Sequence, residues 1–172
     1  PANTLSLHDA LPICVTIPCV TAARKYLEAR GYEVLVFHAT GMGGQSMEAL
    51  IEAGFIEGVL DLTTTEWADE VIGGVLNAGE HRLEAASKNH VPQVVSVGAL
   101  DMCNFGTYDT VPKKFEGRNF YKHNPTVTLM RTNVAENEVI GKKLVEKLNM
   151  AKEKTALFLP LRGIRSEERR VG

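Results

Sequence analysis

The stretch of sequence that decides the fold is Val34-Leu-Val-Phe-His-Ala-Thr-Gly-Met-Gly-Gly-Gln-Ser-Met-Glu48. It begins with a continuous apolar run, residues 34–37, of the kind found in parallel strands that are covered on both faces. Three glycines follow, and the apolar spacing then becomes that of a helix over residues 46–53, which Gly54 closes. A strand, a glycine-rich turn and a helix in this order predict one β/α unit of a layered protein.

The same alternation recurs along the chain. We expect helices over residues 20–30, 46–53, 66–72, 80–87 and 133–152, and strands over 34–37, 58–62, 91–97 and 156–159. Asn133 and Glu136 form a capping-box pattern at the start of the last helix. Because strands that alternate with helices pair in parallel, the expected fold is α/β, a three-layer Rossmann-like parallel sheet with helices on both faces. Residues 98–131 have weak periodicity and are left without an assigned helix or strand, and loops of this length are usually functional or lid-like.

Composition points to a soluble globular protein. The 172 residues are 44% hydrophobic and 23% charged, with a formal net charge of −2. This balance argues against a nucleic-acid partner, because proteins that bind nucleic acids carry a basic surface. No apolar run approaches the roughly 18 to 20 residues that span a bilayer, so no membrane association is expected. Three cysteines without C-x-x-C spacing are typical of a reduced, cytoplasmic protein.

The two ends of the chain differ in character from the rest. Residues 1–13 and 165–172 resemble translations of a sequencing adapter, and we expect both to be non-native segments. The remaining part, residues 14–164, is then one nucleotide-binding lobe, a fragment of a longer gene product.

The glycine-rich turn is the first candidate ligand site. Gly41, Gly43 and Gly44 allow backbone amides to approach an anion closely, and the helix that follows adds its positive end. Thr40 and Ser46 add hydroxyl donors. The spacing is neither that of a Walker loop nor G-x-G-x-x-G. A phosphate site and a purely structural tight turn both remain open at this stage.

Other strand ends also carry polar residues, and ligands of parallel α/β sheets bind at that edge. The candidate contacts there are Thr63, Thr64, Thr65, Gly98, Asn104, Arg131 and Arg162. One of the threonines, Thr65, is also placed to cap the helix that begins at Glu66. Asp101 and His123 are candidate acid/base residues, although each also has a structural interpretation. Cys103 is expected to be an inert thiol, and the spacing predicts no metal site.

Several of these strings resemble the tobamovirus-resistance-protein-like ATP-binding family, an uncharacterised protein family. The matching stretches are 16–21, 37–44, 61–66, 96–102, 123–132 and 159–163, in the family's order. The resemblance implies two Rossmann-like lobes and ATP as cofactor. This chain would be most of the second lobe, and the first lobe of the same protein would be a missing partner.

Three functions compete. The leading hypothesis is a nucleotide-binding domain whose glycine-rich loop contacts phosphate. The second is an enzyme that acts on a small anionic metabolite, with Asp101 or His123 as acid/base and Arg131 or Arg162 as clamp. The third is a regulatory protein-interaction module. The sequence is also compatible with a homo-oligomer, and it leaves open whether the protein is an enzyme.

Overall fold

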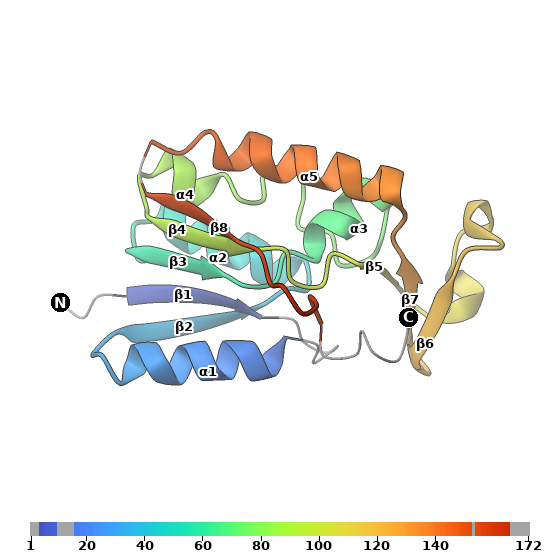
Figure 1. The fold of residues 1–172 in the computed structure, drawn as a ribbon, viewed down its shortest axis with the longest axis horizontal. Coiled ribbons are helices and arrows are strands. Elements are labelled where there is room, and N and C mark those ends of the chain that lie inside the picture. The colour runs from blue at the N-terminus through green and yellow to red at the C-terminus, as the bar shows by residue number, and fades with distance from the viewer. Residues whose placement is uncertain (1–3, 10–15, 153, 166–172) are drawn as a thin grey trace.

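The computed structural model describes residues 4–9, 16–152 and 154–165. The α-helices are α1 (Ile17–Glu28), α2 (Met42–Glu52), α3 (Glu66–Ile72), α4 (Ala85–Lys88) and α5 (Val134–Leu148). The strands are β1 (Thr4–Asp9), β2 (Glu33–His38), β3 (Gly58–Asp61), β4 (Gln93–Ser96), β5 (Met102–Phe105), β6 (Phe120–Asn124), β7 (Val127–Arg131) and β8 (Thr155–Phe158). Figure 1 shows α5 along the top of the parallel sheet and α1 along its base.

Five strands form the parallel sheet, in the order β2-β1-β3-β4-β8. This is a doubly wound order, in which the chain moves outward from β1 to β2 and then reverses direction to β3, β4 and β8. The reversal creates a switch point between β1 and β3, where the connections leave the sheet toward opposite faces. The predicted α/β fold with a parallel sheet is therefore confirmed.

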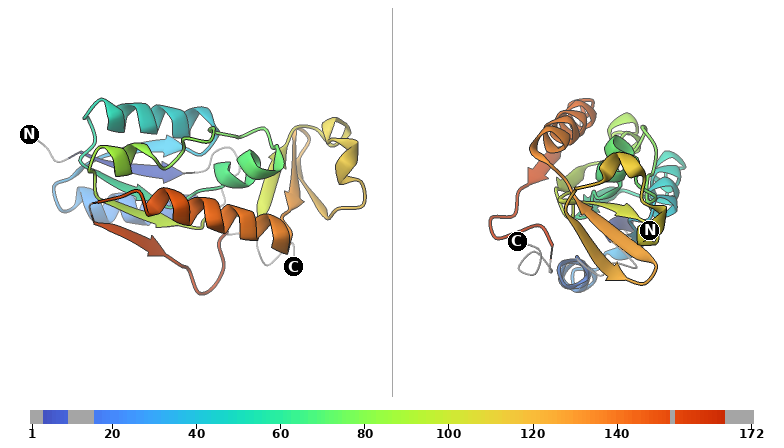
Figure 2. Two further views of the ribbon diagram at one scale, coloured as in Figure 1. Left: turned by 90° about the horizontal axis from the view of Figure 1, so that it is seen from above. Right: turned by 90° about the vertical axis from the view of Figure 1, so that its right-hand side faces the viewer.

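The two faces of this sheet are covered unequally. Val59 of β3 packs against α2 and α4, and Val95 of β4 packs against α3 and α5. On the opposite face, Leu60 packs toward α1, which also covers Val36 of β2. The right-hand view of Figure 2 shows α1 by itself on one side, with α2, α4 and α5 on the other. Helices thus lie on both faces, as predicted, but four of the five lie on one.

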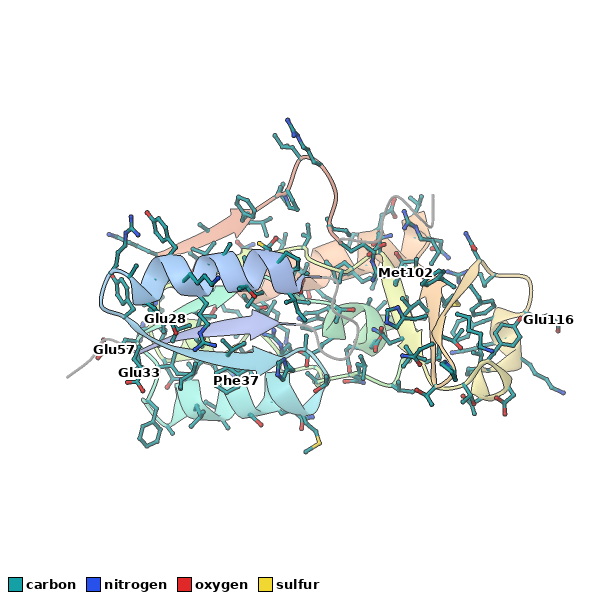
Figure 3. The ribbon with its side chains drawn as sticks, turned by 90° about the horizontal axis from the view of Figure 1, so that it is seen from below. Glu28, Glu33, Phe37, Glu57, Met102 and Glu116 are labelled. Carbon is teal, nitrogen blue, oxygen red and sulfur yellow. The ribbon has the colours of Figure 1, made fainter. Side chains whose placement is uncertain are left out.

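The segment 98–131 is not a lid-like loop. It forms a three-stranded antiparallel sheet in the order β5-β7-β6, with two short 3-10 helices, Tyr108–Thr110 and Lys113–Phe115. Met102 lies at the junction with the parallel sheet, where it packs against Ala39 and Ala99, while Glu116 lies at the far end of the molecule (Figure 3). Its short strands alternate too weakly to be recognised in sequence, which is why the sequence left this segment unassigned.

Two predicted helices have different bounds in the structure. Helix α2 begins at Met42, so Gly43 and Gly44 belong to its first turn rather than to a preceding loop. The helix expected over 80–87 is reduced to α4, because Leu83 adopts a positive φ of 72° and donates its N–H to Glu48. By contrast, α3 has the predicted bounds.

The start of the last helix, α5, confirms the predicted capping box. The side chain of Asn133 accepts from the N–H of Glu136, and the carboxylate of Glu136 accepts from the N–H of Asn133. Arg118 donates to the same carboxylate at 2.8 Å, which ties the antiparallel unit to α5. Arg118, which precedes β6, therefore holds the antiparallel unit to the beginning of this helix.

Strand β1 comes from the segment that is predicted to be non-native. Its backbone pairs in register with β2 and β3. Backbone pairing does not depend on which side chains the strand carries, so the origin of residues 1–13 stays a prediction. Among the described residues, no helix is long and apolar enough to cross a membrane.

Candidate functional site

A cavity lies at the carboxyl ends of the parallel strands, on the side of the sheet that carries α1. Its volume is about 250 Å³, and its walls come from four parts of the chain. Thr16, Pro18 and Cys19 line it at the start of α1, Leu62 lines it after β3, and Ser96 and Gly98 line it at the end of β4. The far side is closed by Phe158, Pro160, Gly163, Ile164 and Arg165. We call this cavity the α1 crevice. It occupies the edge of the sheet at which doubly wound proteins bind ligands.

The switch point contributes directly to this crevice. Thr16, which precedes α1, places its hydroxyl oxygen 2.8 Å from the hydroxyl oxygen of Thr63, which follows β3. Both residues are buried. Thr16 makes no side-chain capping bond to α1, so it does not satisfy the first-turn amides of that 12-residue helix. The positive end of α1 is therefore presented at the crevice.

The loops after β3 and β4 contact each other closely beside the crevice. A Cβ at Gly98 would lie 2.0 Å from the carbonyl oxygen of Leu62, so this position requires glycine. Thr64 donates its N–H to the carbonyl of Gly98 at 3.1 Å and its hydroxyl to the carbonyl of Ser96 at 2.8 Å. Ala99 follows at a positive φ of 60°. The backbones of Gly98 and Leu62 thus approach each other closely beside the crevice, while a ligand contact of Gly98 stays a prediction.

The predicted N-cap position of Thr65, at the start of α3, is confirmed, but a capping hydrogen bond from its side chain is not. Its hydroxyl instead accepts from the side-chain amide of Asn104 at 3.2 Å. Asn104 is a non-local neighbour in β5, which local sequence reasoning could not place. The three consecutive threonines therefore connect different segments, and Thr63 is the one that contacts a residue of the crevice, Thr16.

The glycine-rich turn lies elsewhere, and its amides face inward. Gly41 and Gly44 donate their N–H groups to one carboxylate oxygen of Glu66, at 2.7 and 3.2 Å. Gly41 has a φ of 82°, and a Cβ at Gly43 would lie 1.7 Å from the carbonyl oxygen of His38. The turn thus binds an anion, but this anion is a buried side chain of the same chain. The expectation that these amides face a ligand differs from what the structure shows.

Glu66 belongs to a buried group of charges that we call the Glu66 cluster: Glu48, Asp61, Glu66 and Arg82. The Arg82 side chain is 1% exposed and pairs with Asp61 at 2.5 Å, with Glu66 at 2.8 Å and with Glu48 at 3.2 Å. Burial alone would lower the pKa of Arg82, but the three carboxylates outweigh that effect and raise it. Arg82 therefore stays charged inside the protein and joins α2, β3 and α3.

The hydroxyls at the glycine-rich turn are also used locally. Ser46 donates to the carbonyl of Met42 at 2.8 Å, and the Thr40 hydroxyl lies 3.4 Å from the carbonyl oxygen of His38. Neither residue lines the α1 crevice. The five residues predicted at this turn, Thr40, Gly41, Gly43, Gly44 and Ser46, therefore form a site apart from that cavity.

Asn104 holds a second buried carboxylate. Its backbone N–H donates to Asp69 at 2.7 Å, and its side-chain amide donates to the same group. Leu76 donates to the other carboxylate oxygen of Asp69 at 2.8 Å. Burial raises the pKa of Asp69 to about 6, although these hydrogen bonds oppose the shift. Burial also raises the pKa of the neighbouring Cys103 thiol, as an inert thiol requires.

The candidate acid/base residues do not converge. Asp101 is buried and pairs with Arg165 at 2.7 Å and with Arg131 at 3.0 Å, so its carboxylate is already bound within the protein. His123 lies on β6 of the antiparallel sheet, beside the ring of Tyr121. Arg162 is exposed in the segment after β8. No group of three or more potential metal ligands from His, Cys, Asp and Glu occurs in the part of the chain that the structure describes.

Sequence reasoning missed most residues that line the crevice, among them Thr16, Cys19 and Ser96. The sequence could have indicated the position of Thr16, because a threonine before a helix start that contains proline is typical of a strand-to-helix connection. It also missed Arg82, which is isolated in sequence and finds its partners only through folding.

Known proteins resemble this chain over most of its length. Residues 12–170 match the model of the C-terminal domain of an uncharacterised protein family, UPF0261. The chain belongs to this family. A UPF0261 protein of Clostridium tetani is 65% identical over 150 residues, which are 87% of this chain and 37% of that protein. The ToMV resistance protein Tm-1(GCR237) of tomato is 50% identical over 150 residues, 87% of this chain and 20% of the tomato protein.

The UPF0261 domain thus spans little more than a third of the bacterial relative and a fifth of the tomato protein. The ToMV susceptible protein tm-1(GCR26) of tomato matches almost equally, at 49% identity over 150 residues and with the same coverage. Resemblance to this domain therefore does not separate the resistance protein from the susceptible one.

Proposed function

We propose that this UPF0261 domain supplies a binding site for a small anionic ligand, with a nucleotide such as ATP as the leading candidate, and that the site is the α1 crevice. One observation carries the proposal: a cavity of about 250 Å³ lies at the carboxyl edge of a doubly wound sheet, beside the start of a 12-residue helix. This is the position at which such sheets bind phosphorylated ligands.

The chemistry of the crevice suits a phosphate group. In the first turn of α1, Ile17 and Cys19 carry backbone N–H groups whereas Pro18 carries none, and the helix dipole favours negative charge at that end. The hydroxyl of Thr16 lies at the same end, and Ser96 and Gly98 form the facing wall. Leu62 and Pro160 add apolar surface that can contact an uncharged part of the ligand. Arg165 also lines the cavity, but it falls in the segment predicted to be non-native, so the proposal does not use it.

The glycine-rich turn is not part of the proposed ligand site. Gly41 and Gly44 already donate to Glu66, and an external phosphate would have to displace a buried carboxylate that also pairs with Arg82. Breaking a buried ion pair of this kind costs several kcal/mol, more than two amide contacts return. The phosphate contact predicted from sequence is therefore transferred to the start of α1.

The test is calorimetric titration of ATP into the full-length Clostridium tetani relative. Cys19→Asp, introduced at the aligned position, adds a carboxylate on the first turn of α1 without harming the helix. Ser46→Asp adds the same group near the glycine-rich turn and serves as the matched control. We expect Cys19→Asp to weaken ATP binding by at least about tenfold, because repulsion of roughly 1.4 kcal/mol suffices.

Ser46→Asp should leave the affinity within about twofold of the unsubstituted protein. Absence of ATP binding in the unsubstituted relative would contradict the nucleotide assignment. Loss of binding in Ser46→Asp alone would return the site to the glycine-rich turn.

A further inference from the structure

One face of the parallel sheet is left open beside α1. Leu60, Val94 and Ala156 are register partners on β3, β4 and β8, and they form a row on the face that α1 covers only in part. Val94 is 37% exposed, and Phe158, two residues beyond Ala156 on the same face, is 54% exposed. Strands of parallel sheets are ordinarily buried on both faces. The exposure of this row is therefore unusual for its position.

The open face forms a hollow of about 490 Å³, which we call the α1 trough. Leu27 of α1 forms one side, and Leu60, Val94 and Ala156 form the floor. None of the residues that line the trough lines the α1 crevice, so the two hollows are separate. The lining is mainly apolar, which favours an apolar occupant.

The topology shows where a cover can come from. Right-handed crossovers that run from β2 through β3 and β4 to β8 all place their helices on the face of Val59 and Val95. The opposite crossover, from β1 to β2, places one helix, α1, on the trough side. A second helix on that side must therefore come from outside these connections.

We propose that an amphipathic helix of the same polypeptide, from the part of the longer family members outside the matched residues, packs lengthwise in the α1 trough beside α1. The length of the relatives provides such a segment, because the matched 150 residues are 37% of the Clostridium tetani protein. A helix of about 12 residues would extend about 18 Å, the length of α1, and neighbouring helices pack 8–10 Å apart.

Thiol labelling of the full-length relative tests whether the trough is covered. Val94→Cys, introduced at the aligned position, reports on the trough floor, and Val145→Cys on the exposed face of α5 is the matched control, since Val145 is 49% exposed. We expect the thiol at position 94 to react at least about tenfold more slowly than the one at 145, because reaction requires local opening. Equal rates would overturn the proposal, and this comparison does not require the isolated domain to fold.

A photo-crosslinker attached to the thiol at position 94 then identifies the cover. Crosslinked peptides should come from the same molecule and from outside the matched residues. Crosslinks to a second molecule, or protection at position 94 that disappears when the protein is diluted to monomers, would assign the trough to a dimer interface and overturn the proposal.

Discussion

The carboxyl edge of the sheet holds two polar regions that look alike in sequence and differ in structure. Both follow parallel strands, and both contain small or hydroxyl residues next to the start of a helix. In the Glu66 cluster the amides of Gly41 and Gly44 are bound to a buried carboxylate, and Arg82 completes the charge balance. In the α1 crevice the start of the helix borders a cavity instead.

This difference shows that amide groups alone do not define a ligand site. A buried carboxylate needs donors, because burial without hydrogen bonds is costly. Where the chain supplies its own anion, as Glu66 does, the amides become part of the fold. At the start of α1 the corresponding geometry borders a cavity that a ligand can enter. Substitutions in the Glu66 cluster should therefore reduce stability, whereas substitutions in the crevice should reduce binding.

The largest effect is expected for Arg82→Ala. Removal of this guanidinium leaves three carboxylates without their shared cation, two of them fully buried. The free energy of unfolding should fall by about 3–5 kcal/mol, measured by urea denaturation of the full-length relative. Arg24→Ala is the control, since the exposed pair with Glu28 should contribute at most about 0.5 kcal/mol. A loss below about 1 kcal/mol for Arg82→Ala would remove the structural role assigned to the cluster.

Asp69 differs from the carboxylates of the Glu66 cluster, because amide groups rather than an arginine bind this buried side chain. Its pKa is about 6 in the folded protein against 3.8 for the ordinary side chain. The folded state therefore binds the proton more tightly, and the resulting stability is complete below pH 3.8 and is lost as the pH rises through 6. The shift corresponds to a loss of about 3 kcal/mol.

The measurement for Asp69 compares the unsubstituted protein with Asp69→Asn, which does not titrate. As the pH rises from about 4 to about 7, the unsubstituted protein should lose up to about 3 kcal/mol of unfolding free energy relative to Asp69→Asn. A difference that stays constant with pH would show that Asp69 is not perturbed.

Glu66→Gln is expected to have the next effect. The substitution removes the charge but keeps the shape, so Gly41 and Gly44 still have a carbonyl acceptor, while Arg82 loses one ion pair. Hydrogen bonds to a charged group contribute about 1.5–3 kcal/mol each, and an unfolding free energy lower by about 2 kcal/mol is expected. If the variant instead gained affinity for inorganic phosphate, the Glu66 cluster could bind a ligand as the α1 crevice is proposed to do. That result would contradict the distinction between the two regions.

The smallest change in stability is expected for Cys19→Asp. A carboxylate in the first turn of α1 interacts favourably with the helix dipole, so the unfolding free energy should stay equal or rise by about 0.3–1 kcal/mol. Thermal denaturation of the full-length relative checks this expectation. Destabilisation by more than about 1 kcal/mol would mean that the crevice, like the Glu66 cluster, is part of the packed interior.

Local patterns predicted much of the fold. The bounds of α3, the capping box of α5 and the parallel sheet all follow from short-range spacing. The direction of the Gly41 and Gly44 amides could not be predicted, because it depends on Glu66, which is more than 20 residues away, and on Arg82. The antiparallel sheet was missed because its strands are four or five residues long and because β5 pairs with β7, which is distant in sequence.

Among the candidate site residues, Gly98 and Thr63 were found by their position after a strand, and both lie at or beside the crevice. Asp101 and Arg131 were also found by position, yet they pair with each other, since opposite charges on neighbouring segments neutralise when they are brought together. Sequence position thus locates the edge of the sheet but does not say which side chains remain available to a ligand.

The most direct test is a crystal structure of the full-length Clostridium tetani relative with bound ATP. We predict phosphate oxygens within hydrogen-bond distance of the first-turn amides of α1, with Glu66 still bonded to Gly41 and Gly44. Phosphate bound to the amides of residues 41–44, with the Glu66 carboxylate displaced, would contradict the division of this edge into a closed cluster and an open site.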